Sequence, residues 1–113
     1  MLETIKSSTE VSYVFTHGRR LNTPFVTFIV LQHEKQHGQM GRVAFVAGKK
    51  LGNAVWRNRA KRRMRALCRD LGGPWPNCDV IFLARRQTTQ ATYSKVLDAC
   101  EKTLGGTGFK TSQ

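Results

Sequence analysis

The sequence predicts an α+β fold, a two-layer sandwich in which helices cover one face of a small β-sheet. Residues 24–31, 42–47 and 79–84 are rich in β-branched and aromatic side chains, which is typical of strands. Residues 56–71 and 93–104 instead repeat apolar side chains at helical spacing. With a short helix expected before the first strand, the order is helix, strands, helix, strand, helix. This order favours an α+β domain with its helices on one side of the sheet.

The N-terminal half is expected to contain the first helix and two strands. At 113 residues the chain has room for one domain, 1–113, with a single modest core. Residues 1–8 are polar and are expected to be flexible. A short helix over residues 10–17 is stopped by Gly18. The strand at 42–47 is apolar on both faces, which predicts a central position in the sheet.

The longest predicted helix, residues 54–70, begins and ends at local signals. It follows a glycine-containing turn at 48–52, and Asn53 is a good N-cap residue. Glycine and proline residues between positions 71 and 77 end the helix. A third strand and a last helix follow, and the tail at 105–113 is expected to be flexible.

The charge of the chain indicates a negatively charged partner. Nineteen Lys and Arg residues against seven Asp and Glu residues give a net charge of +12. Such an excess usually serves a polyanion, with nucleic acid the first class and an anionic membrane surface the second. No apolar run approaches the roughly 18–20 residues of a membrane span, and the N-terminus lacks the pattern of a signal peptide. Cys68, Cys78 and Cys100 form an odd set without close pairs, which is typical of reduced thiols. We therefore expect a cytoplasmic protein with no membrane partner.

The helix at 54–70 concentrates this charge. Seven cations lie between Arg57 and Arg69, and no acid occurs between Glu34 and Asp70. At 100° per residue, the apolar side chains form one stripe that would dock on the sheet. The stripe consists of Trp56, Ala60, Met64, Leu67 and Leu71. The cations occupy the opposite arc and one flank, where each like-charge pair four residues apart is unfavourable by about a few tenths of a kcal/mol. Phosphates would reverse this repulsion, so phosphate binding is favoured over the alternative of a solvated charged face.

The stretch GKKLGNAVWRNRAKRRMRALCRD, residues 48–70, resembles the signature of the bacterial ribonuclease P protein subunit. The match includes the paired lysines, the order Gly-Asn-Ala-Val, and then Arg-Asn-Arg, Lys-Arg and Arg. Weaker similarity covers residues 11–20, 41–50 and 78–86. The resemblance implies a ribozyme whose RNA removes the 5′ leader from precursor tRNA, with Mg²⁺ held mainly by the RNA and no organic cofactor. It implies no catalytic residue in the protein. It also implies a mixed central sheet with three helices and a left-handed βαβ crossover, against the usual hand.

The resemblance further implies which residues contact RNA. The partners would be the catalytic RNA and precursor tRNA, with no obligate protein partner. The positions that match the family motif for the catalytic RNA are Lys49, Lys50, Asn53, Arg57, Asn58, Arg59, Lys61, Arg62, Arg63 and Arg65. A cleft between the first helix and the sheet would hold the single-stranded leader through Val11, Phe15, Phe28, Arg85 and Arg86.

Within that cleft, aromatic rings would stack on unpaired bases and cations would follow the backbone. Whether Phe28 faces the cleft or the core remains open at this point. Val11 stands where the family often has a second aromatic residue, which should weaken stacking there.

Two other classes of protein stay open. A non-catalytic RNA-binding protein of ribosomal type would use the same charge pattern. A small metallohydrolase is the other class, because HEKQH at residues 33–37 matches the two histidines and glutamate of zinc peptidases. That pattern requires a helix, whereas this segment is expected to be a loop between strands, so no firm metal site is assigned.

Overall fold

The computed structural model describes Ile5, residues 8–32 and residues 41–105 of the chain. The elements in chain order are α1 (Ser8–His17), β1 (Arg19–Asn22), β2 (Val26–Gln32), β3 (Arg42–Val46), the 3₁₀ turn η2 (Lys49–Leu51), α2 (Ala54–Asp70), β4 (Cys78–Ala84), the 3₁₀ turn η3 (Arg86–Thr89) and α3 (Tyr93–Gly105). The three predicted helices are confirmed as α1, α2 and α3, and the three predicted strands as β2, β3 and β4. Most of the two tails expected to be flexible lies outside the described residues, although Ser8 begins α1 and Gly105 ends α3.

The four strands form one mixed sheet with the order β1-β2-β4-β3. β2 pairs antiparallel with both β1 and β4, whereas β3 and β4 are parallel neighbours. Parallel neighbours cannot be joined by a hairpin, and here η2 and α2 make the connection. The α+β class, the mixed sheet and the β3–α2–β4 crossover are confirmed, and the left hand of that crossover stays a prediction.

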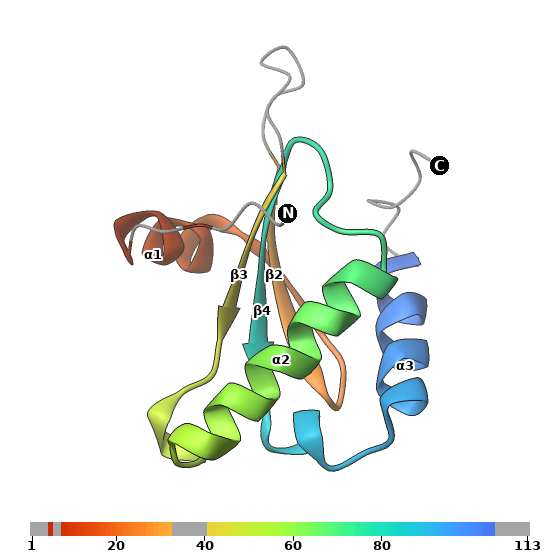
Figure 1. Cartoon of the computed structure of the whole chain (residues 1–113). Coiled ribbons are helices and arrows are strands. Elements are labelled where there is room, and N and C mark those ends of the chain that lie inside the picture. Colours follow the sequence, from red (N-terminus) through yellow and green to blue (C-terminus); the bar gives the residue numbers. More distant parts are fainter. Residues whose placement is uncertain (1–4, 6–7, 33–40, 106–113) are drawn as a thin grey trace.

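Helices lie on both faces of the sheet (Figure 1). On one face, α2 and α3 cover a core that contains Phe28 and Met64. On the other face, Val14 of α1 packs against Ile29 and Ile81. The expectation that the helices cover one face is therefore wrong for α1. The physical reason is that successive strand residues point to opposite faces, and both sets are mostly apolar and buried in β2 and β4.

The edges of the sheet differ from expectation. β3 is an edge strand and not a central one. Its two faces are nevertheless covered, because Val43 belongs to the α2–α3 core and Ala44 to the cluster under α1. At its outer edge, the N–H of Ile5 donates to the carbonyl of Val43 at 2.8 Å. The opposite edge strand, β1, was not predicted, because among its four residues only Leu21 is buried.

α2 begins and ends as its sequence predicts. The Oδ1 atom of Asn53 accepts a hydrogen bond from the N–H of Trp56 at 2.9 Å, which confirms the N-cap. The predicted stripe is buried at Ala60, Met64, Leu67 and Leu71. Trp56 is half-buried, and its Nε1 donates to Oγ1 of Thr89 at 2.9 Å. Beyond the helix, Gly72 has a φ of 90°, a conformation that favours glycine.

Candidate nucleic-acid interface

The turn η2 and the outer side of α2 form a basic surface, here the α2 surface. Its exposed members among the predicted RNA contacts are Lys49, Lys50, Asn53, Asn58, Arg59, Arg62 and Arg65. Arg57, Lys61 and Arg63 are half-buried. Between described residues, no ion pair joins a cation of the segment 57–65 to an acid, and the ion pair of α2 lies beyond it, between Arg69 and Asp70 at 3.7 Å. Acidic side chains of the described residues therefore do not neutralise the charge of this surface.

Arg63 has a structural role that its motif did not predict. Its Nη1 donates to the carbonyls of Thr88, at 3.1 Å, and Ala91, and its guanidinium lies 5.8 Å from the centre of the Tyr93 ring. The Tyr93 hydroxyl donates to the carboxylate of Asp70, and burial together with this bond raises the pKa of Tyr93. These contacts join α2 to η3 and α3. An RNA contact by Arg63 stays a prediction.

Arg65 is supported by an aromatic ring. Its guanidinium carbon lies 5.5 Å from the centre of the half-buried Phe45 ring. A guanidinium held in this way retains its charge and its N–H donors while losing some of its freedom. Arg65 can therefore contact a phosphate or a base without first being ordered.

Arg85 and Arg86 follow β4 and border a pocket of about 390 Å³. The pocket is also lined by Pro24, Leu51, Ala84 and Gln87. Nη1 of Arg85 donates to the carbonyl of Thr23 at 3.1 Å, which fixes this side chain near the start of β2. Because Leu51 belongs to η2, the two arginines border the turn that opens the α2 surface. The structure thus brings them close to the basic motif.

A second surface lies on the α1 side of the sheet. Half-buried apolar side chains pack there around the buried cluster under α1, and we name them the α1 patch: Val11, Phe15, Leu31, Val46 and Leu83. Val11 and Phe15 come together as predicted. The other three were missed, because an apolar strand residue gives no local sign of whether a helix covers it completely. The guanidinium carbon of Arg20 lies 5.9 Å from the centre of the Phe15 ring.

Phe28 is not part of the α1 patch. It is 0% exposed, and its ring meets that of Phe82 edge-on with centroids 4.9 Å apart. Its register partner Leu21 is buried in the same α2–α3 core. The prediction that Phe28 lines the leader cleft is therefore wrong. The alternation of β2 turns Phe28 toward α2 and α3, and turns Ile29 toward α1.

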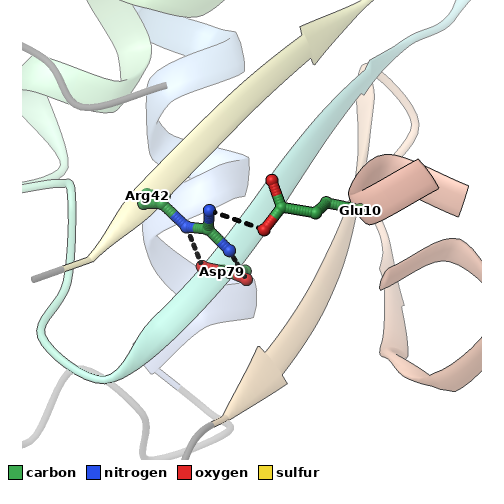
Figure 2. Close-up of polar contacts among 3 residues, drawn as sticks. All are labelled: Glu10, Arg42 and Asp79. Atoms are coloured by element: carbon green, nitrogen blue, oxygen red, sulfur yellow. Dashed lines mark hydrogen bonds and ion pairs between the residues drawn. The ribbon is translucent and has the colours of Figure 1, made fainter. Parts of the chain in front are cut away.

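Arg42 ties α1 to the sheet (Figure 2). Its Nε and Nη2 donate to the two carboxylate oxygens of Asp79 at 3.1 and 2.8 Å, and its Nη1 donates to Oε2 of Glu10 at 3.0 Å. The bond to Asp79 is the main cause that raises the pKa of Arg42, and burial opposes it. Asp79 is 2% exposed, so its buried carboxylate is paired with the guanidinium of Arg42 through two hydrogen bonds. One guanidinium joins α1, β3 and β4, three of the elements that carry the α1 patch.

The three cysteines are buried free thiols, as predicted. Burial raises the pKa of Cys68 to about 11 and that of Cys100 to about 12, and it also raises the pKa of Cys78. A thiol with such a pKa stays protonated at neutral pH and is a weak nucleophile. The cysteines therefore act as small apolar side chains of the core.

Metal chemistry finds little support in the described residues. The HEKQH segment at 33–37 lies outside them. Elsewhere in the described part of the chain, no three His, Cys, Asp or Glu side chains gather. The carboxylates of Glu10 and Asp79 both bind Arg42. With their oxygens bound to a guanidinium, these two carboxylates do not fit a Mg²⁺ centre.

Comparison with known families decides between the classes that the sequence left open. The profile of the family described as Ribonuclease P matches residues 2–108. The chain belongs to the ribonuclease P protein family. Among members of this family, the ribonuclease P protein component of Natranaerobius thermophilus is 35% identical over 94 residues, which is 81% of this chain and 78% of the relative. That of Shouchella clausii is 32% identical over 102 residues, 88% of this chain and 81% of the relative.

Solved ribonuclease P proteins share the fold. The RNase P protein of Staphylococcus aureus superimposes with a TM-score of 0.75 at 22% identity, covering 95% of this chain and 96% of the other. The RNase P protein from Thermotoga maritima gives a TM-score of 0.71 at 20% identity, covering 88% and 93%. As for membranes, the residues that the structure describes contain no helix of the length and apolarity needed to cross a bilayer.

Proposed function

We propose that this protein is the protein subunit of a ribonuclease P ribozyme and supports maturation of the 5′ end of tRNA. In this proposal it binds the catalytic RNA through the α2 surface and the single-stranded leader of precursor tRNA through the α1 patch. The observation that carries the proposal is the charge of the α2 surface, which lacks acidic partners among the described residues and coincides with the family motif.

Binding of the catalytic RNA follows from electrostatics. Each exposed cation that meets a phosphate releases condensed counterions, which favours binding and makes it depend on salt. Arg59, Arg62 and Arg65 are exposed along α2 and are arginines, whose planar fork suits bidentate phosphate contacts. Lys49 and Lys50 extend the row into η2. The like-charge repulsion within α2 is relieved when phosphates lie along it.

Binding of the leader follows from the α1 patch. Unpaired bases offer flat apolar faces, and an aromatic ring such as that of Phe15 is a suitable stacking surface for them. Arg85 and Arg86, at the end of β4, would follow the leader backbone toward the α2 surface. Packing of Val14 against Ile29 and Ile81, together with the bond between Arg42 and Glu10, places α1 on the sheet and keeps Phe15 against it.

The protein's contribution to cleavage is binding and orientation. In the proposed complex Mg²⁺ is held by the RNA and supplies the hydrolytic chemistry there. The cations of the α2 surface lower the repulsion between RNA segments, which lets the RNA fold at lower Mg²⁺ concentration. The α1 patch adds affinity only for a substrate that still carries a leader.

Reconstitution tests the proposal. Purified protein is added to a bacterial ribonuclease P RNA at low Mg²⁺ with labelled precursor tRNA, beside reactions that lack the RNA or the protein. We expect leader release to need the RNA and to be stimulated by the protein. Affinity of the complex should be higher for precursor than for mature tRNA.

Two results would contradict this. Binding to RNA without any stimulation of leader release would contradict the role in the ribozyme and leave only an RNA-binding role. Equal affinity for precursor and mature tRNA would remove the leader from the proposal while leaving the catalytic RNA as a partner.

A further inference from the structure

Arg20 is a cation on the α1 side of the sheet that the family motif does not include. It pairs in register with Ile29, whose side chain lies under α1, so the Arg20 side chain points to the same face. There its guanidinium carbon lies 5.9 Å from the centre of the Phe15 ring. The neighbouring Arg19 pairs with Val30, which belongs to the core on the opposite face.

Among the described residues, the elements around the α1 patch supply little other positive charge. The sequence of α1, STEVSYVFTH, contains neither lysine nor arginine and carries Glu10. Arg42 reaches this side of the sheet, but its three nitrogens donate to Asp79 and Glu10. Arg20 is exposed, and between described residues it makes no ion pair. Its charge is therefore available beside the ring of Phe15.

A ring and a guanidinium at this distance suit one unpaired nucleotide. Phe15 offers an apolar face to a base, and the planar guanidinium can extend that face while donating N–H groups to the phosphate of the same nucleotide. An apolar or acidic peptide would match only one half of this pair. The combination is also useful here because Val11, the neighbouring α1 residue of the patch, has no ring to stack on a second base.

We propose that Arg20 is a nucleotide-binding residue that holds one nucleotide of the single-stranded leader against Phe15. The inference rests on the proposed function of the α1 patch. Arg20 acts on substrate binding, and it has no part in bond cleavage.

The experiment uses the reconstituted complex of protein and catalytic RNA, and measures the affinity for precursor tRNA and for mature tRNA. Arg19→Ala is a matched control, since it removes the same charge from the adjacent exposed residue on the other face. Because Arg20→Ala removes the cation but leaves the Phe15 ring for stacking, we expect it to weaken precursor binding by about five- to twentyfold, which is about 1–1.8 kcal/mol at about 1.4 kcal/mol per tenfold change. Mature tRNA should bind within about twofold of wild type, as should precursor tRNA to Arg19→Ala. Arg20→Lys keeps the positive charge but not the planar guanidinium, so relative to Arg20→Ala it should restore only the salt-dependent part of the lost affinity.

A series of leaders shortened one nucleotide at a time gives a second readout. The effect of Arg20→Ala should disappear at the length that removes the contacted nucleotide. Equal effects of Arg20→Ala and Arg19→Ala, or an Arg20→Ala effect that persists on mature tRNA, would overturn the role of Arg20. A wild-type complex that does not prefer precursor over mature tRNA would instead overturn the proposed function of the α1 patch.

Discussion

Replacement of Arg42 by methionine should destabilise the fold by about 3–5 kcal/mol, the typical cost of breaking a buried ion pair. The change keeps a long unbranched side chain but removes both hydrogen bonds to Asp79, which is 2% exposed. Charge-assisted bonds of this kind contribute about 1.5–3 kcal/mol each, so two of them give about 3–6 kcal/mol, which overlaps that range. The bond to Glu10 adds little, because 47% of the Glu10 side chain is exposed and exposed pairs contribute about 0.2–1 kcal/mol. Glu10→Gln should therefore cost less than about 1 kcal/mol.

Urea unfolding measures these differences. With a slope of about 1.5 kcal/mol per M, a loss of about 3 kcal/mol lowers the midpoint by about 2 M. The double variant Arg42→Met, Asp79→Leu should recover most of the loss, because it also removes the buried carboxylate. Asp98→Asn, which breaks an exposed ion pair with Lys102, is the control and should change little. A loss below about 1 kcal/mol for Arg42→Met, with an unchanged slope, would refute the reasoning.

Three further changes test other parts of the molecule. Arg59→Ala with Arg62→Ala should lower the slope of log affinity against log salt by about two for the catalytic RNA. Removal of the two α3 lysines, Lys95 and Lys102, is the control and should not lower it. Arg63→Ala should mainly lower the urea midpoint, because its bonds to η3 and to the segment before α3 are lost. Phe28→Ala should cost about 3–5 kcal/mol of stability and reduce precursor and mature tRNA binding alike. A loss of affinity confined to precursor tRNA would instead indicate that Phe28 contacts the leader. Because burial raises the pKa of Cys68 to about 11, the folded state keeps a proton that the unfolded chain releases near pH 9, so stability should fall from about pH 9 to 11. Urea midpoints of Cys68→Ala should fall less steeply over that range, and parallel curves would argue against this cause.

The parts of the fold that the sequence predicted well depend on local signals. α2 has both its ends and its buried stripe where the sequence places them, because a cap, two glycines and a 3.6-residue period all lie within the segment itself. β1 escaped prediction because four residues with one buried side chain carry too little pattern. The position of β3 at an edge was missed because coverage by α1 and α2 makes an edge strand as apolar as a central one.

The candidate site divides in the same way. The exposed cations of the α2 surface follow from the helical wheel and the motif. Residues 24–31 alone do not show on which face of the sheet Phe28 lies, because the alternate residues on both faces of this strand are mostly apolar. The ion pair between Arg42 and Asp79 depends on the pairing of β3 with β4. The two residues are 37 positions apart in the sequence, so no local pattern predicts their contact. The internal use of Arg63 has the same cause, because its acceptors lie on η3 and on the segment before α3.

The order β1-β2-β4-β3 has a consequence for how the chain folds during synthesis. The central pair of strands, β2 and β4, comes from opposite halves of the chain, so the sheet has no centre until residues 78–84 have left the ribosome. Pairing at such long sequence separation is slow to form. α2 is made earlier, and its like charges oppose a helix that has no sheet to dock on. The timing of β4 therefore sets when α2 first has a complete sheet to dock on, and with it when the nascent protein can first hold its row of guanidinium groups in place.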